Sequence, residues 1–396
     1  MRSPTDPDSA ATPVPGRAAP TTSGDQPPAA DEQPATSVEQ PATGQEQPAT
    51  SAEHSSTGQE QPATAGKGAA DGGSAPGRFG GLRRHRRWLL PLVVVLLLAQ
   101  MAAAMLSTAV QQTPTIDEPV YVGTAMVYLR EDSLRYNFEH PPLGKLIIGT
   151  GLLFADAHFD PAFTGDQGAV GRHLLYESGN DPGRLMLLAR LPMILLTLLF
   201  GLVVYVFAAD LVGRVGGLAA LALYAFSPDV IAHGSLATLD VPAAGFLLTS
   251  AWLLWRARRR PLRYLPLAAT ALGAALATRM SALAAVPVLL LLAVLSVWSA
   301  AGGGKRRDPR GRVRLLGLGV AAATGVGLVA VAVVWATYLV VDPRLSWVTP
   351  ENLRAVHGLR GMVLDWLPLP RPYLDGMRFQ FQIEDKTLAW AWRSRT

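Results

Sequence analysis

Two neighbouring carboxylates, Asp117 and Glu118, are the first residues whose type and spacing suit catalysis. A carboxylate that is partly removed from water can act as a general base and take a proton from a hydroxyl group. The same residues also suit the start of a short helix, in which Asp117 is an N-cap and Glu118 and Pro119 stand in the first turn. The residue types alone leave both interpretations open.

A second motif, His-Pro-Pro-Leu-Gly-Lys, runs from His140 to Lys145. Its prolines stiffen the backbone, and its His and Lys side chains are hydrogen-bond donors that suit a phosphate group. Alternatively, the segment is a rigid loop whose His and Lys contact lipid headgroups. The occurrence of both motifs in a single predicted loop favours a joint function.

Two further charged residues stand beside apolar segments. Arg279 lies between two apolar runs, where an ionisable residue is a functional candidate. An arginine that extends its side chain to the outer lipid headgroups is the alternative. Asp240 directly precedes Val241 and Pro242, so on residue types it suits an N-cap with Pro242 in the first turn.

Long apolar segments must position these residues. The chain is 49% hydrophobic and 16% charged, whereas soluble proteins carry about 25% charged residues. Runs that approach or exceed the roughly 20 apolar residues that span a bilayer recur after residue 85. We therefore predict an all-α polytopic membrane protein of about seven transmembrane helices, at residues 88–106, 185–208, 215–226, 241–255, 264–277, 281–299 and 315–341.

Clusters of basic residues indicate the orientation. Those at 83–87, 256–263 and 305–314 lie beside apolar runs, as in cytoplasmic loops. Because they account for most of the net charge of +5, we expect membrane lipids and no nucleic acid as partners. The N-terminus is then cytoplasmic, and 107–184 is an extracytoplasmic loop that holds both motifs. Four lysines beside abundant Arg, Ala, Gly and Pro indicate a bacterial coding sequence, and hence the bacterial cytoplasmic membrane.

The chain divides into three regions. Residues 1–80 repeat the unit Glu-Gln-Pro-Ala-Thr and have too little apolar surface to fold, which predicts a disordered cytoplasmic tail. Residues 81–341 form the predicted transmembrane domain with its outer loop. Residues 342–396 are predicted to be an extracytoplasmic segment, in which Trp390 and Trp392 suit a membrane interface.

Several kinds of site are disfavoured. Cysteine is absent, which excludes disulfides and thiolate metal sites. The histidines His158, His173 and His357 lack metal-ligand spacing, so no metal site is predicted. The absence of a glycine-rich phosphate loop disfavours a nucleotide-sugar donor.

The order of the motifs resembles that of the GT-C glycosyltransferases, and most closely glycosyltransferase family 39, with its protein O-mannosyltransferase and aminoarabinose-transferase branches. The resemblance rests on Asp-Glu-x-x-Tyr from Asp117 to Tyr121, on the His140 motif and on Arg-x-Pro at Arg190. It covers residues from about 89 to 373. It implies a GT-C-like fold with a helical outer loop that carries the catalytic carboxylates.

The resemblance also implies an activity. A monosaccharide, with mannose as one candidate, would move from a polyprenyl-phosphate carrier to a hydroxyl group of a protein, lipid or glycan by a single inverting displacement. Asp117 would be the catalytic base, and Glu118 would tune its pKa or hold the acceptor. The resemblance makes His140, Lys145 and Arg279 candidates for binding the donor phosphate. It makes Tyr121 and Asp240 candidates for substrate binding. No cofactor is implied; some GT-C enzymes use a divalent metal, which these carboxylates do not indicate.

Two other classes stay open. A non-enzymatic transporter would use the charged residues as a substrate path, but no internal repeat is visible and the charged motifs gather outside the membrane. A truncated, inactive family member is the second, because members of the family usually continue with further spans after the Pro-rich segment that resembles residues 367–373.

Overall fold

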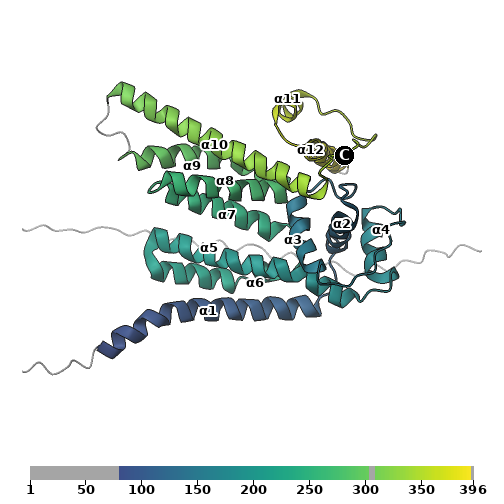
Figure 1. Ribbon diagram of the computed structural model, residues 1–396, viewed down its shortest axis with the longest axis horizontal. Helices are drawn as coiled ribbons and strands as arrows, with labels where there is room; N and C mark the ends of the chain where they lie inside the picture. The colour runs from purple at the N-terminus through teal and green to yellow at the C-terminus, as the bar shows by residue number, and fades with distance from the viewer. Residues whose placement is uncertain (1–79, 303–307, 394–396) are drawn as a thin grey trace, which may run out of the picture. The chain divides into compact units, whose positions relative to one another are not determined.

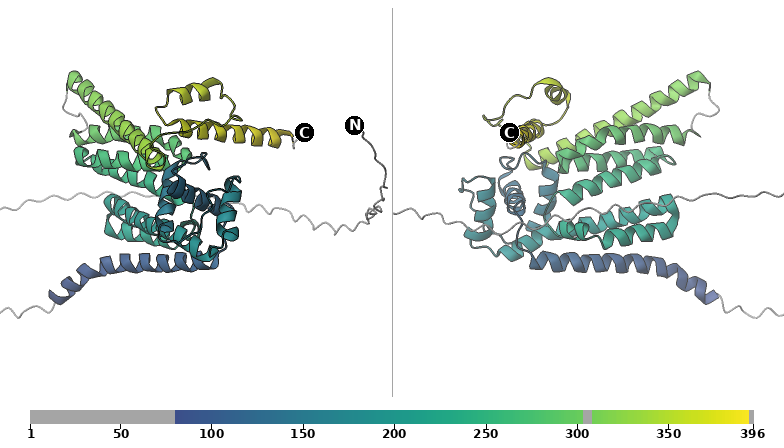
Figure 2. Two further views of the ribbon diagram at one scale, coloured as in Figure 1. Left: turned by 45° about the vertical axis from the view of Figure 1, so that its right-hand side comes forward. Right: turned by 180° about the vertical axis from the view of Figure 1, so that it is seen from behind.

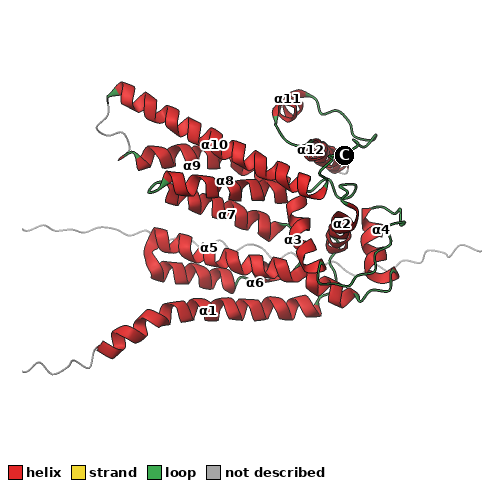
Figure 3. Cartoon of the chain, in the orientation of Figure 1, coloured by secondary structure: helices red, strands yellow, loops and turns green. Residues whose placement is uncertain are grey.

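A computed structural model describes residues 80–302 and 308–393 of the chain. Within these ranges every regular element is a helix, and Figure 3 shows helices joined by loops. The predicted all-α class is therefore confirmed. The prediction of a disordered tail falls on residues that lie outside the described ranges, apart from Gly80 itself.

Four helical stretches among the described residues are long and apolar enough to cross a membrane. They are Trp88–Gln111 of α1 (Gly80–Gln111), α5 (Pro182–Ala225), Met280–Ala300, which joins η2 (Met280–Ala285) to α9 (Val286–Ala300), and α10 (Pro309–Val341). Two helices of 18 residues, α7 (Asp240–Ala257) and α8 (Pro261–Thr278), pack among them. All seven predicted spans lie on helical elements, except that Phe226 follows the end of α5, and the count of seven stays a prediction.

The long element α5 is two helices. Its backbone breaks at Gly213, whose φ of 85° belongs to the left-handed region that glycine adopts without strain. The chain then turns back on itself. The two arms lie side by side, and the Tyr224 hydroxyl of the second donates a 3.1 Å hydrogen bond to the Thr197 carbonyl of the first. The two arms correspond to the predicted spans 185–208 and 215–226, so the second, short span is one arm of a tight hairpin.

Small side chains allow close packing around α8. Most of its second half, from Ala268 to Thr278, is buried against α7, α9 and α10. A Cβ added at Gly273 would lie 2.7 Å from the carbonyl oxygen of Ala330, so glycine lets α10 approach closely. Packing through small residues is the usual way in which helices associate inside a bilayer.

The segment after α1 folds into short helices that gather at one end of the long ones (Figures 1 and 2). They are α2 (Glu118–Glu131), α3 (Pro142–Leu152), α4 (Gln167–Arg172) and the π-helix η1 (His173–Glu177). α2 packs on α3 and α4, and α3 packs on α5 and α8. A further short helix, α6 (Pro228–Gly234), packs on α1, α5 and α7. This arrangement brings the Asp117 and His140 motifs to the same end of the long helices.

The C-terminal segment contains α11 (Gly358–Trp366) and α12 (Arg371–Arg393). The buried Asp375 carboxylate fixes α12 to the chain before it, accepting hydrogen bonds from Trp347 Nε1 at 2.9 Å and Thr349 Oγ1 at 2.8 Å. The side chains of Trp390 and Trp392, predicted at a membrane interface, lie outside what the structure describes.

Candidate active site

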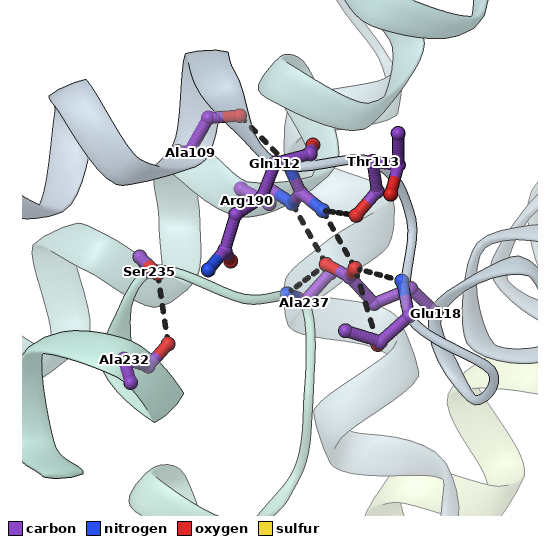
Figure 4. Close-up of polar contacts among 9 residues, drawn as sticks. Ala109, Gln112, Thr113, Glu118, Arg190, Ala232, Ser235 and Ala237 are labelled. Carbon is purple, nitrogen blue, oxygen red and sulfur yellow. Dashed lines mark hydrogen bonds and ion pairs between the residues drawn. The ribbon is translucent and has the colours of Figure 1, made fainter.

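The Glu118 carboxylate is fully buried at the first turn of α2. Figure 4 shows it between Arg190 and the backbone of Ala237. Arg190 reaches it from α5 with two hydrogen bonds, Nε to Oε1 at 2.8 Å and Nη2 to Oε2 at 2.6 Å. The Ala237 N–H donates at 2.8 Å, and Thr115 donates through its N–H at 2.9 Å and its hydroxyl at 3.2 Å.

Arg190 also ties the end of α1 to this cluster. Its guanidinium donates to the carbonyl oxygens of Ala109, Gln112 and Thr113 at 2.7, 3.0 and 3.3 Å (Figure 4). Both charges are buried, yet each is hydrogen-bonded on several sides, which is the condition under which a buried ion pair is tolerated. The pair therefore joins α1, α2, α5 and the loop before α7.

This environment keeps Glu118 ionised. Burial opposes the charge most strongly, but the hydrogen bonds from Arg190, Thr115 and Ala237 outweigh burial and hold the pKa of Glu118 below its usual value. A carboxylate with both oxygens occupied has no site for an acceptor hydroxyl. In this geometry both oxygens of Glu118 are occupied by protein donors, and Glu118 positions the start of α2.

Asp117 has the opposite environment. Its side chain is exposed, and it makes no hydrogen bond to any residue that the structure describes. Asp117 does occupy the N-cap position of α2, but its carboxylate accepts no capping bond. The interpretation as a helix cap, open from the sequence, therefore lacks the hydrogen bond that would define it.

Lys145 is buried inside the outer loop. Its ammonium donates to the Asn137 carbonyl at 2.6 Å, the Asn137 side-chain oxygen at 3.0 Å and the His140 carbonyl at 2.6 Å. An ammonium has three N–H groups, and all three are used. Lys145 thus fixes the backbone that carries His140, and this geometry leaves it no hydrogen to offer a phosphate.

His140 and Tyr121 meet edge to face, with ring centroids 5.8 Å apart. Burial, with the nearby charges of Lys145 and Arg279, lowers the pKa of His140 to about 3, so its ring is neutral at physiological pH. Its Nδ1 is buried and has no partner among the described residues. Burial raises the pKa of Tyr121 to about 12, with a smaller contribution from Asp117.

Arg279 and Asp240 form an ion pair between the end of α8 and the start of α7. Both side chains are partly exposed, at 34% for Arg279 and 56% for Asp240. Asp240 is the first residue of α7 and Leu239 is the N-cap, so Asp240 does not take the N-cap position that the sequence also allowed. Arg279 lines a cavity of about 640 Å³ together with His140.

The structure adds residues that the sequence did not single out. The Glu139 carboxylate accepts hydrogen bonds from Asn137 Nδ2 at 2.9 Å and Gln167 Nε2 at 2.7 Å, and the second bond links the segment before α3 to the start of α4. No sequence signal connects Gln167 to Glu139. Arg190 was noted only as part of the Arg-x-Pro motif; its pairing with Glu118 could have been sought, because a charged residue inside an apolar run needs a partner. Among the described residues, no three His, Asp or Glu side chains converge as metal ligands would.

The candidate site lies within the part of the chain that matches a known family. Residues 94–341 match the family model described as "Dolichyl-phosphate-mannose-protein mannosyltransferase". The matched range includes each residue of the candidate site discussed so far. No curated protein matches the chain.

Proposed function

Since the chain belongs to the dolichyl-phosphate-mannose-protein mannosyltransferase family, we propose that it moves a monosaccharide, mannose in the first place, from a polyprenyl-phosphate donor to a hydroxyl acceptor outside the cytoplasm. The observation that carries the proposal is the different environment of the two adjacent carboxylates. Glu118 is buried and fully bonded, whereas Asp117 is exposed and unbonded beside Tyr121. Asp117 is therefore the carboxylate able to meet a substrate.

The proposed reaction is one inverting displacement. Asp117 takes the proton of the acceptor hydroxyl while the acceptor oxygen bonds to the anomeric carbon of the sugar. The bond between that carbon and the phosphate oxygen breaks, and polyprenyl phosphate leaves with its electron pair. A phosphate leaving group needs little protonation but gains from a nearby cation, and Arg279 in the cavity supplies one.

The other site residues divide by their contacts. His140, neutral and lining the cavity, is proposed to contact the donor. Tyr121 and Asp240 are proposed to border the substrate through their contacts with His140 and Arg279. Glu118 and Lys145 are proposed to position the loop, because their polar atoms are already occupied.

The proposed topology has seven spans, with both α5 arms counted, in a bacterial cytoplasmic membrane. The loop 107–184 then lies outside and the α7–α8 turn inside. Because the chain has no cysteine, single cysteines test this directly. Thr164→Cys should react with a membrane-impermeant maleimide in intact cells, and Arg259→Cys only after permeabilisation; the reverse result would overturn the orientation.

The activity is tested with purified protein in lipid nanodiscs. The protein is given polyprenyl phosphates carrying different monosaccharides, with hydroxyl-bearing peptides, lipids or glycans, and release of polyprenyl phosphate is measured. We expect release with the mannose donor, coupled to mannose on one acceptor class. Uptake of sugar into vesicles without cleavage would favour a transporter, and no release from any donor would contradict the proposal.

A further inference from the structure

The cavity that contains His140 and Arg279 has one wall from η2 and another from α12. The η2 wall is largely apolar, and it continues into α9, whose apolar helix is long enough to enter a membrane. The α12 wall adds two polar side chains, Gln380 and Glu384, and the aromatic ring of Phe381. The cavity therefore combines a cation, an acid and an aromatic ring beside an apolar path.

α12 is seated firmly on the outer loop. Gly376 approaches so closely that an added Cβ would overlap the carbonyl oxygen of Phe138 and the end of the Met280 side chain. Gln380 Nε2 donates to the Glu139 carbonyl at 3.2 Å, and the Phe138 and Phe379 rings lie 5.2 Å apart. These contacts place the α12 wall next to the backbone that carries His140.

Glu384 is available to a ligand. Half of its side chain is exposed, and its contacts with described residues are a 3.4 Å ion pair with Arg360, itself half-exposed. A surface pair of this kind is weak, of about 0–1 kcal/mol, so it can yield to a better partner. A carboxylate can accept hydrogen bonds from two hydroxyl groups. The Phe381 ring, which has the Arg360 guanidinium 5.0 Å from its centroid, adds an apolar surface to the same cavity wall.

We propose that Glu384, supported by Phe381 and Gln380, binds the hydroxyl groups of the donor monosaccharide and determines which sugar the protein accepts. This rests on the proposed function, since it assumes that the donor phosphate lies at Arg279. The sugar then occupies the space between Arg279 and α12, and the polyprenyl chain follows the η2 wall toward α9. Glu384 is a specificity-determining residue and takes no part in bond making.

The test compares Glu384→Gln with Arg360→Gln in the donor-cleavage assay, because both substitutions remove the Glu384–Arg360 ion pair but only the first removes the carboxylate. Arg360→Gln also removes a 3.7 Å pair with Asp385 and the cation 5.0 Å from the centroid of the Phe381 ring. Glu384→Gln should raise the KM for the mannose donor about tenfold, the loss expected for a hydrogen bond to a charged group, with a smaller effect on kcat. Arg360→Gln should keep KM within about twofold of the unchanged protein. Glu384→Asp, which keeps the charge but shortens its reach, should change the ratio of kcat/KM between epimeric sugar donors.

Each result decides the question. Equal KM increases for Glu384→Gln and Arg360→Gln would show that Glu384 acts only through the ion pair, and unchanged KM and sugar preference in both Glu384 variants would also overturn the inference. Unchanged melting temperatures show that the variants are folded. If the unchanged protein cleaves no donor, the proposed function fails and this inference fails with it; if it cleaves donor while the Glu384 variants behave normally, only this inference fails.

Discussion

Substitution of Arg190 should lower the free energy of unfolding more than substitution of an exposed arginine. In Arg190→Met, Glu118 keeps its bonds from Thr115 and Ala237 but loses the two from the guanidinium, and its charge stays buried. A hydrogen bond to a charged group contributes about 1.5–3 kcal/mol, and breaking a buried ion pair costs about 3–5 kcal/mol. We therefore expect Arg190→Met to lower the free energy of unfolding by about 3–5 kcal/mol.

The assay is SDS-induced unfolding in mixed micelles, followed by tryptophan fluorescence. The matched control is Arg135→Met, because Arg135 also bonds a glutamate, Glu131, at 3.0 Å but is 38% exposed. The control should cost less than about 1 kcal/mol.

A double variant isolates the pair itself. Glu118→Leu with Arg190→Met buries no charge, so it should cost less than the sum of the single variants by up to about 3 kcal/mol. Single costs below about 1 kcal/mol, or costs that simply add, would refute the reasoning that the pair is buried and coupled.

Two further outcomes test the packing and the electrostatics of the outer loop. Gly171→Ala would push a Cβ into the carbonyl oxygen of Pro119, beside Asp117 and Glu118, and should lower the free energy of unfolding by about 1–3 kcal/mol. In the control Gly168→Ala, on the same helix, the added Cβ meets its nearest atom only at 3.4 Å, so the melting temperature should stay unchanged or rise. Equal effects of the two substitutions would contradict the close approach of Gly171 to Pro119. The pKa of His140 is lowered from 6.5 to about 3, so the unfolded chain takes up a proton that the folded chain does not. Stability should therefore be full above pH 6.5 and fall as the pH drops toward 3, and His140→Gln should flatten this slope in melting curves recorded across pH; an unchanged slope would show that His140 titrates normally.

The helices were largely predictable because membrane-spanning helices require apolar runs and the loops between them carry basic clusters. The break in α5 was visible too, since the polar Asp210 and Arg214 flank Gly213 and separate two apolar runs. The position of η2 was not visible, because η2 packs on α7, α8 and α9, which are distant or separate elements that local composition does not reveal.

The candidate residues were found by type, but their environments were not. Asp117 and Glu118 are adjacent and chemically alike, and only tertiary contacts with Arg190 and the Ala237 amide distinguish them. Lys145 has the residue type of a phosphate ligand, yet the loop folds so that its own carbonyls occupy the ammonium.

The α12 wall could not be anticipated at all. The hydrogen bond that seats it, from Gln380 to Glu139, joins residues 241 positions apart in the sequence. A contact of that range leaves no trace in local periodicity or motif spacing, so Glu384 acquires its candidate role only from the folded chain.

The central claim is that Asp117 is the base of a sugar transfer, and one measurement tests it most directly. Transfer of labelled mannose from the polyprenyl-phosphate donor is compared for Asp117→Asn and for Asp156→Asn, an exposed acid in the same loop. Asp117→Asn should lower kcat by about 10²–10⁴ with no change in melting temperature, because its carboxylate makes no bond to the described protein, while Asp156→Asn should stay active. Transfer at the unchanged rate by Asp117→Asn would contradict the account.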